Sequence, residues 1–98
     1  MNVEKINDIK VYTPENFEDL YELTHILTNV TKNVIINCKS VIVLPSYFIS
    51  ASIVKKQYVI LTHMSYVSKK IVKVVGAEQS ICIKDDVISA IKYIEQKV

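Results

Sequence analysis

Two short apolar runs, at residues 34–36 and 59–61, constrain the fold more than any other feature of the sequence. Each run is too short for a buried helix and is rich in β-branched residues, which favours a strand covered on both faces. Such strands are usually parallel, and a parallel pair needs a crossover of about a dozen residues or more, normally a helix. Residues 46–57 can supply that helix, after a turn at Pro45. The centre of the chain is therefore predicted to be a β-α-β unit.

The remaining elements extend this unit in both directions. Strands are expected at residues 3–6, 9–12, 34–38, 58–62 and 80–83, and helices follow the last four of them. The order β-β-α-β-α-β-α-β-α predicts an α/β fold with a mainly parallel sheet of four to five strands and helices on its faces. A chain of 98 residues is too small to divide its core in two, so we expect a single domain over residues 1–98.

Helix starts are predicted from capping residues. Thr13 before Pro14 is expected to open the first helix, Ser46 the second, Ser65 the third, and the acidic pair ending at Asp86 the last. The second helix is apolar nearly all round and is therefore expected to be heavily buried. Core-facing residues are predicted from helical spacing: Phe17, Leu20, Tyr21, Thr24, Leu27 and Thr28 in the first helix; Phe48, Ile49, Ala51, Ile53 and Val54 in the second; Val67, Ile71, Val74 and Val75 in the third, ended by Gly76; and Val87, Ile88, Ile91, Ile94 and Val98 in the last.

Composition argues against several classes of function. The twelve basic residues are all Lys and are scattered among ten acidic residues, whereas a nucleic-acid surface normally shows an Arg-containing basic cluster. The longest mainly apolar stretch, 41–54, is shorter than the roughly 20 residues of a membrane span. The N-terminus lacks the apolar core of a signal peptide, which predicts a cytoplasmic protein. Cys38 and Cys82 lie in apolar runs, so we expect buried free thiols, no metal site and no cofactor.

From residue 34 onward, the order and spacing of the segments resemble the STAS domain, the fold of bacterial anti-sigma-factor antagonists. In that family an apolar strand runs into a short hydrophobic segment and an Asp-Ser-Ser-Gly motif that opens a helix. The segment VIINCKSVIVLPSYF occupies that place here, and YVILTH, SYVSKKIVKVVGAEQS, ICI and KDDVISAIKYI match the strands and helices that follow. The resemblance implies a STAS-like fold and a bacterial signalling role.

The motif itself departs from the family pattern. Pro45, Ser46, Tyr47 and Phe48 stand in its place, which keeps one Ser, loses the Asp and puts Tyr47 at the usual phosphoacceptor position. Ser46 is the remaining phosphoacceptor candidate, since a phosphoserine would add about −1.5 to −2 charges at a helix N-terminus. These four residues are also the predicted partner-binding site, because aromatic side chains beside a helix start are typical of interaction hot spots.

Two classes of function follow. The first is a non-catalytic regulatory module with a lost phospho-switch; the resemblance implies as partner a kinase-type anti-sigma factor, another STAS protein, or a larger sensory or transport complex of which the chain is a fixed subunit. The alternative is a small enzyme that uses Cys38 and His63, because both lie near the ends of neighbouring strands and a thiolate-imidazole pair is a known nucleophile. No acidic residue is placed to orient His63, which favours the first class.

Overall fold

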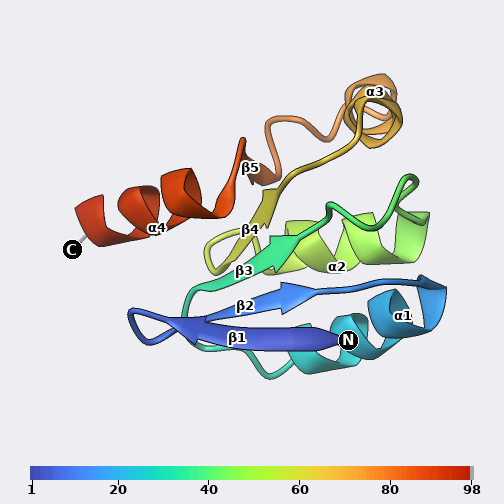
Figure 1. Cartoon of the computed structure of the whole chain (residues 1–98). Coiled ribbons are helices and arrows are strands. Elements are labelled where there is room, and N and C mark those ends of the chain that lie inside the picture. The colour runs from blue at the N-terminus through green and yellow to red at the C-terminus, as the bar shows by residue number, and fades with distance from the viewer. Residues whose placement is uncertain (98) are drawn as a thin grey trace.

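The computed structural model describes residues 1–97, in which five strands form one sheet and four helices pack on it (Figure 1). The elements are β1 (Asn2–Ile6), β2 (Ile9–Thr13), α1 (Phe17–Leu27), β3 (Val34–Asn37), α2 (Ser46–Val54), β4 (Val59–Thr62), α3 (Tyr66–Val74), β5 (Cys82–Lys84) and α4 (Val87–Gln96). Their order confirms the predicted α/β arrangement, although β5 begins two residues later than expected.

The sheet has the strand order β1-β2-β3-β4-β5. β1 and β2 form an antiparallel hairpin, whose turn residues Asn7 and Asp8 have φ values of 51° and 66°, as a two-residue turn of this kind requires. The other pairs are parallel, and Ile35 lies opposite Ile60 at the centre of the sheet. Every residue of β3 and β4 is buried, which confirms that both apolar runs are strands covered on both faces.

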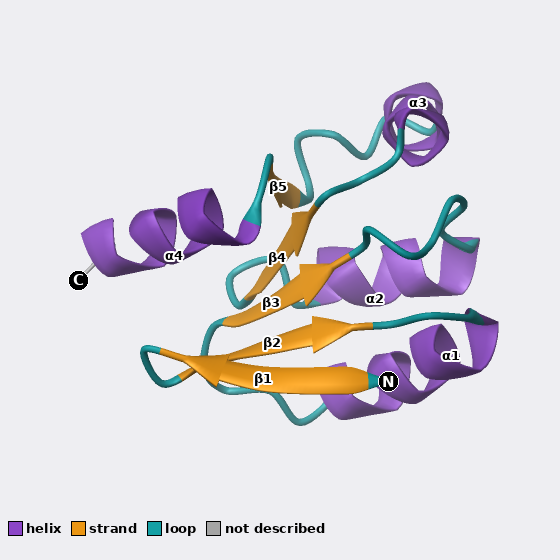
Figure 2. Cartoon of the chain, viewed as in Figure 1, coloured by secondary structure: helices purple, strands orange, loops and turns teal. Residues whose placement is uncertain are grey.

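Helices cover the two faces unequally (Figure 2). One core joins α1, α2 and α3 to the sheet through residues such as Leu23, Phe48 and Val72. The opposite face carries α4, whose Ala90, Ile91 and Ile94 pack against β2, β3 and β4. α4 begins as predicted, because the Oδ1 atom of Asp86 accepts a hydrogen bond from the Ser89 amide at 2.7 Å. In this helix Ile88 is exposed, contrary to prediction, and Val98 lies outside the described residues.

The first helix differs from its prediction in its start and in its buried face. Thr13 ends β2, and Asn16 caps α1 by accepting a hydrogen bond from the Asp19 amide at 2.9 Å. Its buried residues are Leu20, Leu23 and Leu27, whereas Phe17 and Tyr21 are exposed. The second helix is less buried than predicted: Phe48, Ile49 and Ser52 face the core, and Ile53 and Val54 face solvent.

The third helix turns its apolar stripe away from the core, contrary to prediction. Ser65 caps it and Gly76 ends it at φ 73°, both as expected, but its buried residues are Ser68 and Val72. The Ser68 hydroxyl donates to the Ile42 carbonyl at 2.9 Å and accepts from the Leu44 amide at 3.2 Å. Through these two hydrogen bonds, α3 packs against the loop with its serine side. The exposed side carries the predicted core residues Val67, Val74 and Val75, with Ile71 half-buried.

This orientation predicts opposite outcomes for two valines of α3. Val72→Ala should lower the free energy of unfolding by about 2 kcal/mol, because the side chain is 1% exposed and its loss leaves a cavity. Val74→Ala should change it by less than about 0.5 kcal/mol, because that side chain is 77% exposed. Urea denaturation followed by circular dichroism measures both. A larger loss at Val74 than at Val72 would show that α3 is rotated the other way.

Candidate functional site

The candidate site lies where the chain leaves β3 and enters α2, at the carboxyl end of the parallel strands (Figure 1). The predicted apolar segment 41–44 forms a bent loop, in which Val41 and Leu44 are buried and Ile42 and Val43 are exposed. Ser65 and Ser68, at the start of α3, both donate hydrogen bonds to the Ile42 carbonyl. The loop that precedes α2 is therefore held from the far side by α3.

The start of α2 is not capped by Ser46, so that prediction is wrong. Ser46 is the first residue of the helix, and Pro45 occupies the cap position with φ −70° and ψ 156°. The Pro45 carbonyl accepts from the Phe48 and Ile49 amides, but no side chain in the described part of the chain caps this end. Because the helix already includes Ser46 as its first residue, the serine lies one position too late to cap it. Ser46 is exposed, and its hydroxyl is not used in a helix cap.

The two aromatic residues after Ser46 take opposite environments. Phe48 is 0% exposed and belongs to the core under α1, so it cannot contact a partner and the prediction that it does is wrong. Tyr47 is 42% exposed, and its hydroxyl donates to the Phe17 carbonyl at 3.3 Å. Its ring meets Tyr21 edge to face, with 6.0 Å between ring centroids. The exposed half of the predicted site thus consists of Ser46 and Tyr47, beside the half-buried Pro45.

Four further apolar side chains extend this surface. Phe17 and Tyr21 come from α1, and Ile42 and Val43 from the loop; Ile42 is 70% exposed. Phe17, Ile42 and Val43 line one groove of about 350 Å³, bordered by Glu15 and Ser40. We call the exposed set the α1–α2 patch, which consists of Phe17, Tyr21, Ile42, Val43 and Tyr47.

Sequence reasoning missed most of this patch, because it assigned Phe17 and Tyr21 to the buried face of α1. A signal was present: Leu20, Leu23 and Leu27 follow i, i+3, i+7 spacing by themselves. A helix face already filled by three leucines leaves the aromatic residues at its margin.

The residues of the alternative enzyme are not arranged for catalysis. The Cys38 thiol is buried, which raises its pKa from 9.0 to about 12, and its Sγ atom lies 3.7 Å from the Ile36 carbonyl, to which it donates. His63 is exposed at φ 54°, and its Nδ1 atom lies 3.1 Å from the Thr62 hydroxyl. A thiol kept protonated inside the core cannot act as a nucleophile at neutral pH. The prediction of a Cys38–His63 pair is therefore not supported.

Three further findings concern other kinds of site. Within residues 1–97, no group of three or more His, Cys, Asp and Glu side chains lies close enough together to hold a metal ion. None of the helices described here has the length and apolar character needed to cross a bilayer. Both cysteines are free thiols; Cys38 is buried as predicted, but Cys82 is only half-buried, contrary to prediction.

Known structures share this architecture. No family model and no curated protein matches the sequence. A serine-to-glutamate variant of RsbS from Moorella thermoacetica superposes with a TM-score of 0.70 at 14% identity, over 98% of this chain and 95% of that one. A protein of Thermotoga maritima, assigned as an anti-sigma factor antagonist, superposes with a TM-score of 0.75 at 9% identity, over 96% and 93% of the two chains. The fold is STAS-like.

A third STAS-like neighbour is a chain of the stressosome, described as a signal integration and transduction hub; it matches at a TM-score of 0.70 and 13% identity over 98% of this chain. The STAS-like fold therefore covers the N-terminal hairpin as well as the part from residue 34 onward, where the sequence resemblance was found. At identities of 9–14% the likeness concerns the fold, and function has to be argued from the residues of this chain.

Proposed function

We propose that this protein is a non-catalytic regulatory module of the bacterial cytoplasm that binds a protein partner through the α1–α2 patch, with Pro45 and Ser46 at its border. The observation that carries the proposal is the group of five exposed apolar side chains at an uncapped helix start. Contiguous exposed apolar surface of this kind marks interaction sites, and Tyr is among the residues that dominate binding energy. The neighbours RsbS, the stressosome chain and the anti-sigma factor antagonist support a signalling role.

The partner we propose is a kinase-type anti-sigma factor, another STAS protein, or a subunit of a larger sensory or transport complex. We further propose a fixed module whose phospho-switch is lost. Tyr47 stands at the phosphoacceptor position of the family motif, and its hydroxyl is already engaged with the Phe17 carbonyl. Ser46 is the one accessible hydroxyl left from that motif.

The patch can be tested by affinity. A photo-crosslinking amino acid at position 42 identifies the partner in the host, and the purified pair is then titrated by calorimetry. Tyr47→Ala and Ile42→Ala should each weaken binding by about tenfold or more, as loss of a hot-spot side chain does. Val74→Ala, which removes an equally apolar exposed side chain on α3, is the matched control and should leave the affinity unchanged.

Two results would contradict the proposal in different ways. Equal affinity of the native chain and both patch variants would place the interface elsewhere. The proposed loss of the switch is tested by incubating the protein with the host's own kinases, followed by intact-mass measurement and site mapping. Phosphorylation of Ser46 in the native chain that is absent in Ser46→Ala would show a working switch and contradict the fixed module.

A further inference from the structure

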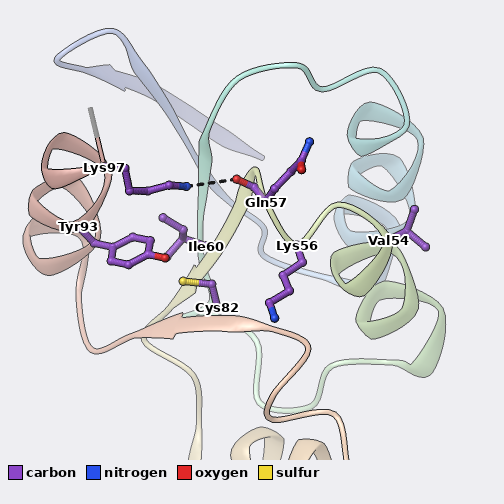
Figure 3. A pocket seen from close by; sticks show the side chains of 7 residues that line it. All are labelled: Val54, Lys56, Gln57, Ile60, Cys82, Tyr93 and Lys97. Carbon is purple, nitrogen blue, oxygen red and sulfur yellow. Dashed lines mark hydrogen bonds between the residues drawn. The ribbon is translucent and has the colours of Figure 1, made fainter.

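A second cavity lies at the opposite end of α2, between the last turns of α2 and α4 and the start of β5 (Figure 3). Its volume is about 340 Å³, within the lower range of small-molecule sites. The side chains of Ile60, Cys82 and Tyr93 lie together in it, and Lys56 and Lys97 stand at its border. We call it the α4 cavity. It shares no residue with the α1–α2 patch.

The charges around the α4 cavity are positive. The Nζ atom of Lys97 donates to the Gln57 carbonyl at 3.3 Å, and that of Lys56 donates to the Gln79 carbonyl at 2.8 Å. Each ammonium group has three donors, so each retains hydrogen atoms for a ligand. Among the described residues that line the cavity there is no Asp or Glu. The C-terminal ends of α2 and α4 contribute about half a negative charge each, which the two lysines outweigh.

Tyr93 connects the charged and apolar parts of the cavity. The Nζ atoms of Lys84 and Lys97 lie 4.3 Å and 5.4 Å from its ring centroid. Its hydroxyl is directed toward Cys82 (Figure 3). Interaction with the neighbouring Cys82, through charge and through a side-chain hydrogen bond, raises the pKa of Tyr93 above its ordinary value. Ile60 adds an apolar wall from β4.

We propose that the α4 cavity binds a small organic monoanion, a carboxylate on an apolar body, with its charge at Lys97 and its body against Ile60 and Tyr93, while Lys56 adds positive potential at the opposite border. A phosphate group fits less well: the chain has no Arg, and the helices present their C-terminal ends here, whereas phosphate sites use helix N-termini. This inference stands apart from the proposed protein-binding function.

Benzoate and its neutral analogue benzyl alcohol test the role of charge. In NMR titrations of the full chain, benzoate should bind with a Kd of about 1 mM or tighter and shift the amides of Gln57, Cys82 and Tyr93, while benzyl alcohol should bind at least about tenfold more weakly. Lys97→Gln should weaken the binding of benzoate by about tenfold, as loss of a charge-assisted hydrogen bond does. Lys69→Gln, on exposed α3, is the control. Weaker binding than 1 mM, or equal affinity of the Lys97→Gln variant, would overturn the proposal.

The Cys82 thiol offers a second readout that needs no bound probe. The positive charges of Lys56 and Lys97 should raise the rate at which Cys82 reacts with the anionic reagent iodoacetate, relative to its rate with neutral iodoacetamide. The ratio of their rates at Cys82 should fall about tenfold in the Lys56→Gln/Lys97→Gln double variant, and 1 M salt should reduce it in the native chain. Peptide mass spectrometry separates Cys82 from the buried Cys38. If the ratio is the same in both proteins, Lys56 and Lys97 create no positive potential at Cys82, and the proposal is overturned.

Discussion

Replacing Phe48 by Ala is expected to lower the free energy of unfolding by about 3–5 kcal/mol. The side chain is 0% exposed and is the largest of the fully buried side chains, in the core that joins α1, α2 and α3 to the sheet. Its removal leaves a cavity that the surrounding helices and strands can fill only in part. Because small domains have a total stability of roughly 5–15 kcal/mol, this one change should remove a large share of it. Denaturation in guanidinium chloride, followed by circular dichroism, measures the loss.

The neighbouring residue supplies a matched control. Tyr47→Ala removes another aromatic ring from the same turn of α2, but the ring is 42% exposed and makes one hydrogen bond, at 3.3 Å, to the Phe17 carbonyl. Its loss should cost about 1 kcal/mol or less. The two variants therefore separate folding from binding: Phe48→Ala should act on stability and Tyr47→Ala on partner affinity. A loss of stability at Tyr47 as large as at Phe48 would place the tyrosine in the core and remove the basis of the α1–α2 patch.

The sheet was predictable because its central strands are buried on both faces. Such strands appear in the sequence as unbroken β-branched runs, and the crossover rule then fixes their parallel order. The single glycine was equally informative: Gly76 ends α3 at a positive φ, which a residue without a Cβ adopts most easily. These features are local, or follow from general rules of chain connection.

The faces of α1 and α3 were not predictable in the same way. Apolar spacing identified both helices but not their rotation, since both carry more apolar residues than the core accepts. In α3 the rotation is set by Ser68, whose partners Ile42 and Leu44 lie more than twenty residues away in sequence. No periodicity within the helix contains that information. The side of the helix that is buried is the one whose serine bonds to this distant loop, a tertiary contact.

The turn at which the candidate site is placed followed from the sequence, but the side chains around it did not. A turn between a buried strand and a helix was expected at Pro45, and the structure has it there. Phe17 and Tyr21 reach the site because α1 packs beside α2, which is a tertiary contact. Tyr47 and Phe48 are adjacent, yet about 100° apart around the helix axis, so one is at the surface and the other in the core. The sequence analysis placed Phe48 both among the core-facing residues of α2 and in the predicted partner-binding site, and the structure has it in the core.

The Cys38 thiol should be nearly inert, which tests the alternative of catalysis. Burial raises its pKa from 9.0 to about 12, so at pH 8 its thiolate fraction should be about a thousandfold below that of an ordinary thiol. Only the thiolate reacts, and the core also blocks access. Iodoacetamide labelling of the folded chain, resolved by peptide mass spectrometry, should therefore modify Cys82 well before Cys38. In denaturant both should react. Rapid labelling of Cys38 in the folded chain would restore the enzyme hypothesis.

The same raised pKa predicts how stability depends on alkaline pH. Between pH 9 and 12 the unfolded chain loses the Cys38 proton while the folded chain keeps it, so the free energy of unfolding must fall with rising pH. The contribution of this thiol is fully present below pH 9 and falls by up to about 1.4 kcal/mol per pH unit above it. Cys38→Ala lacks this contribution but shares all other titrations, so the difference in stability between the native chain and the variant should shrink above pH 9. Parallel profiles would mean that the thiol ionises as easily in the folded chain as in the unfolded one.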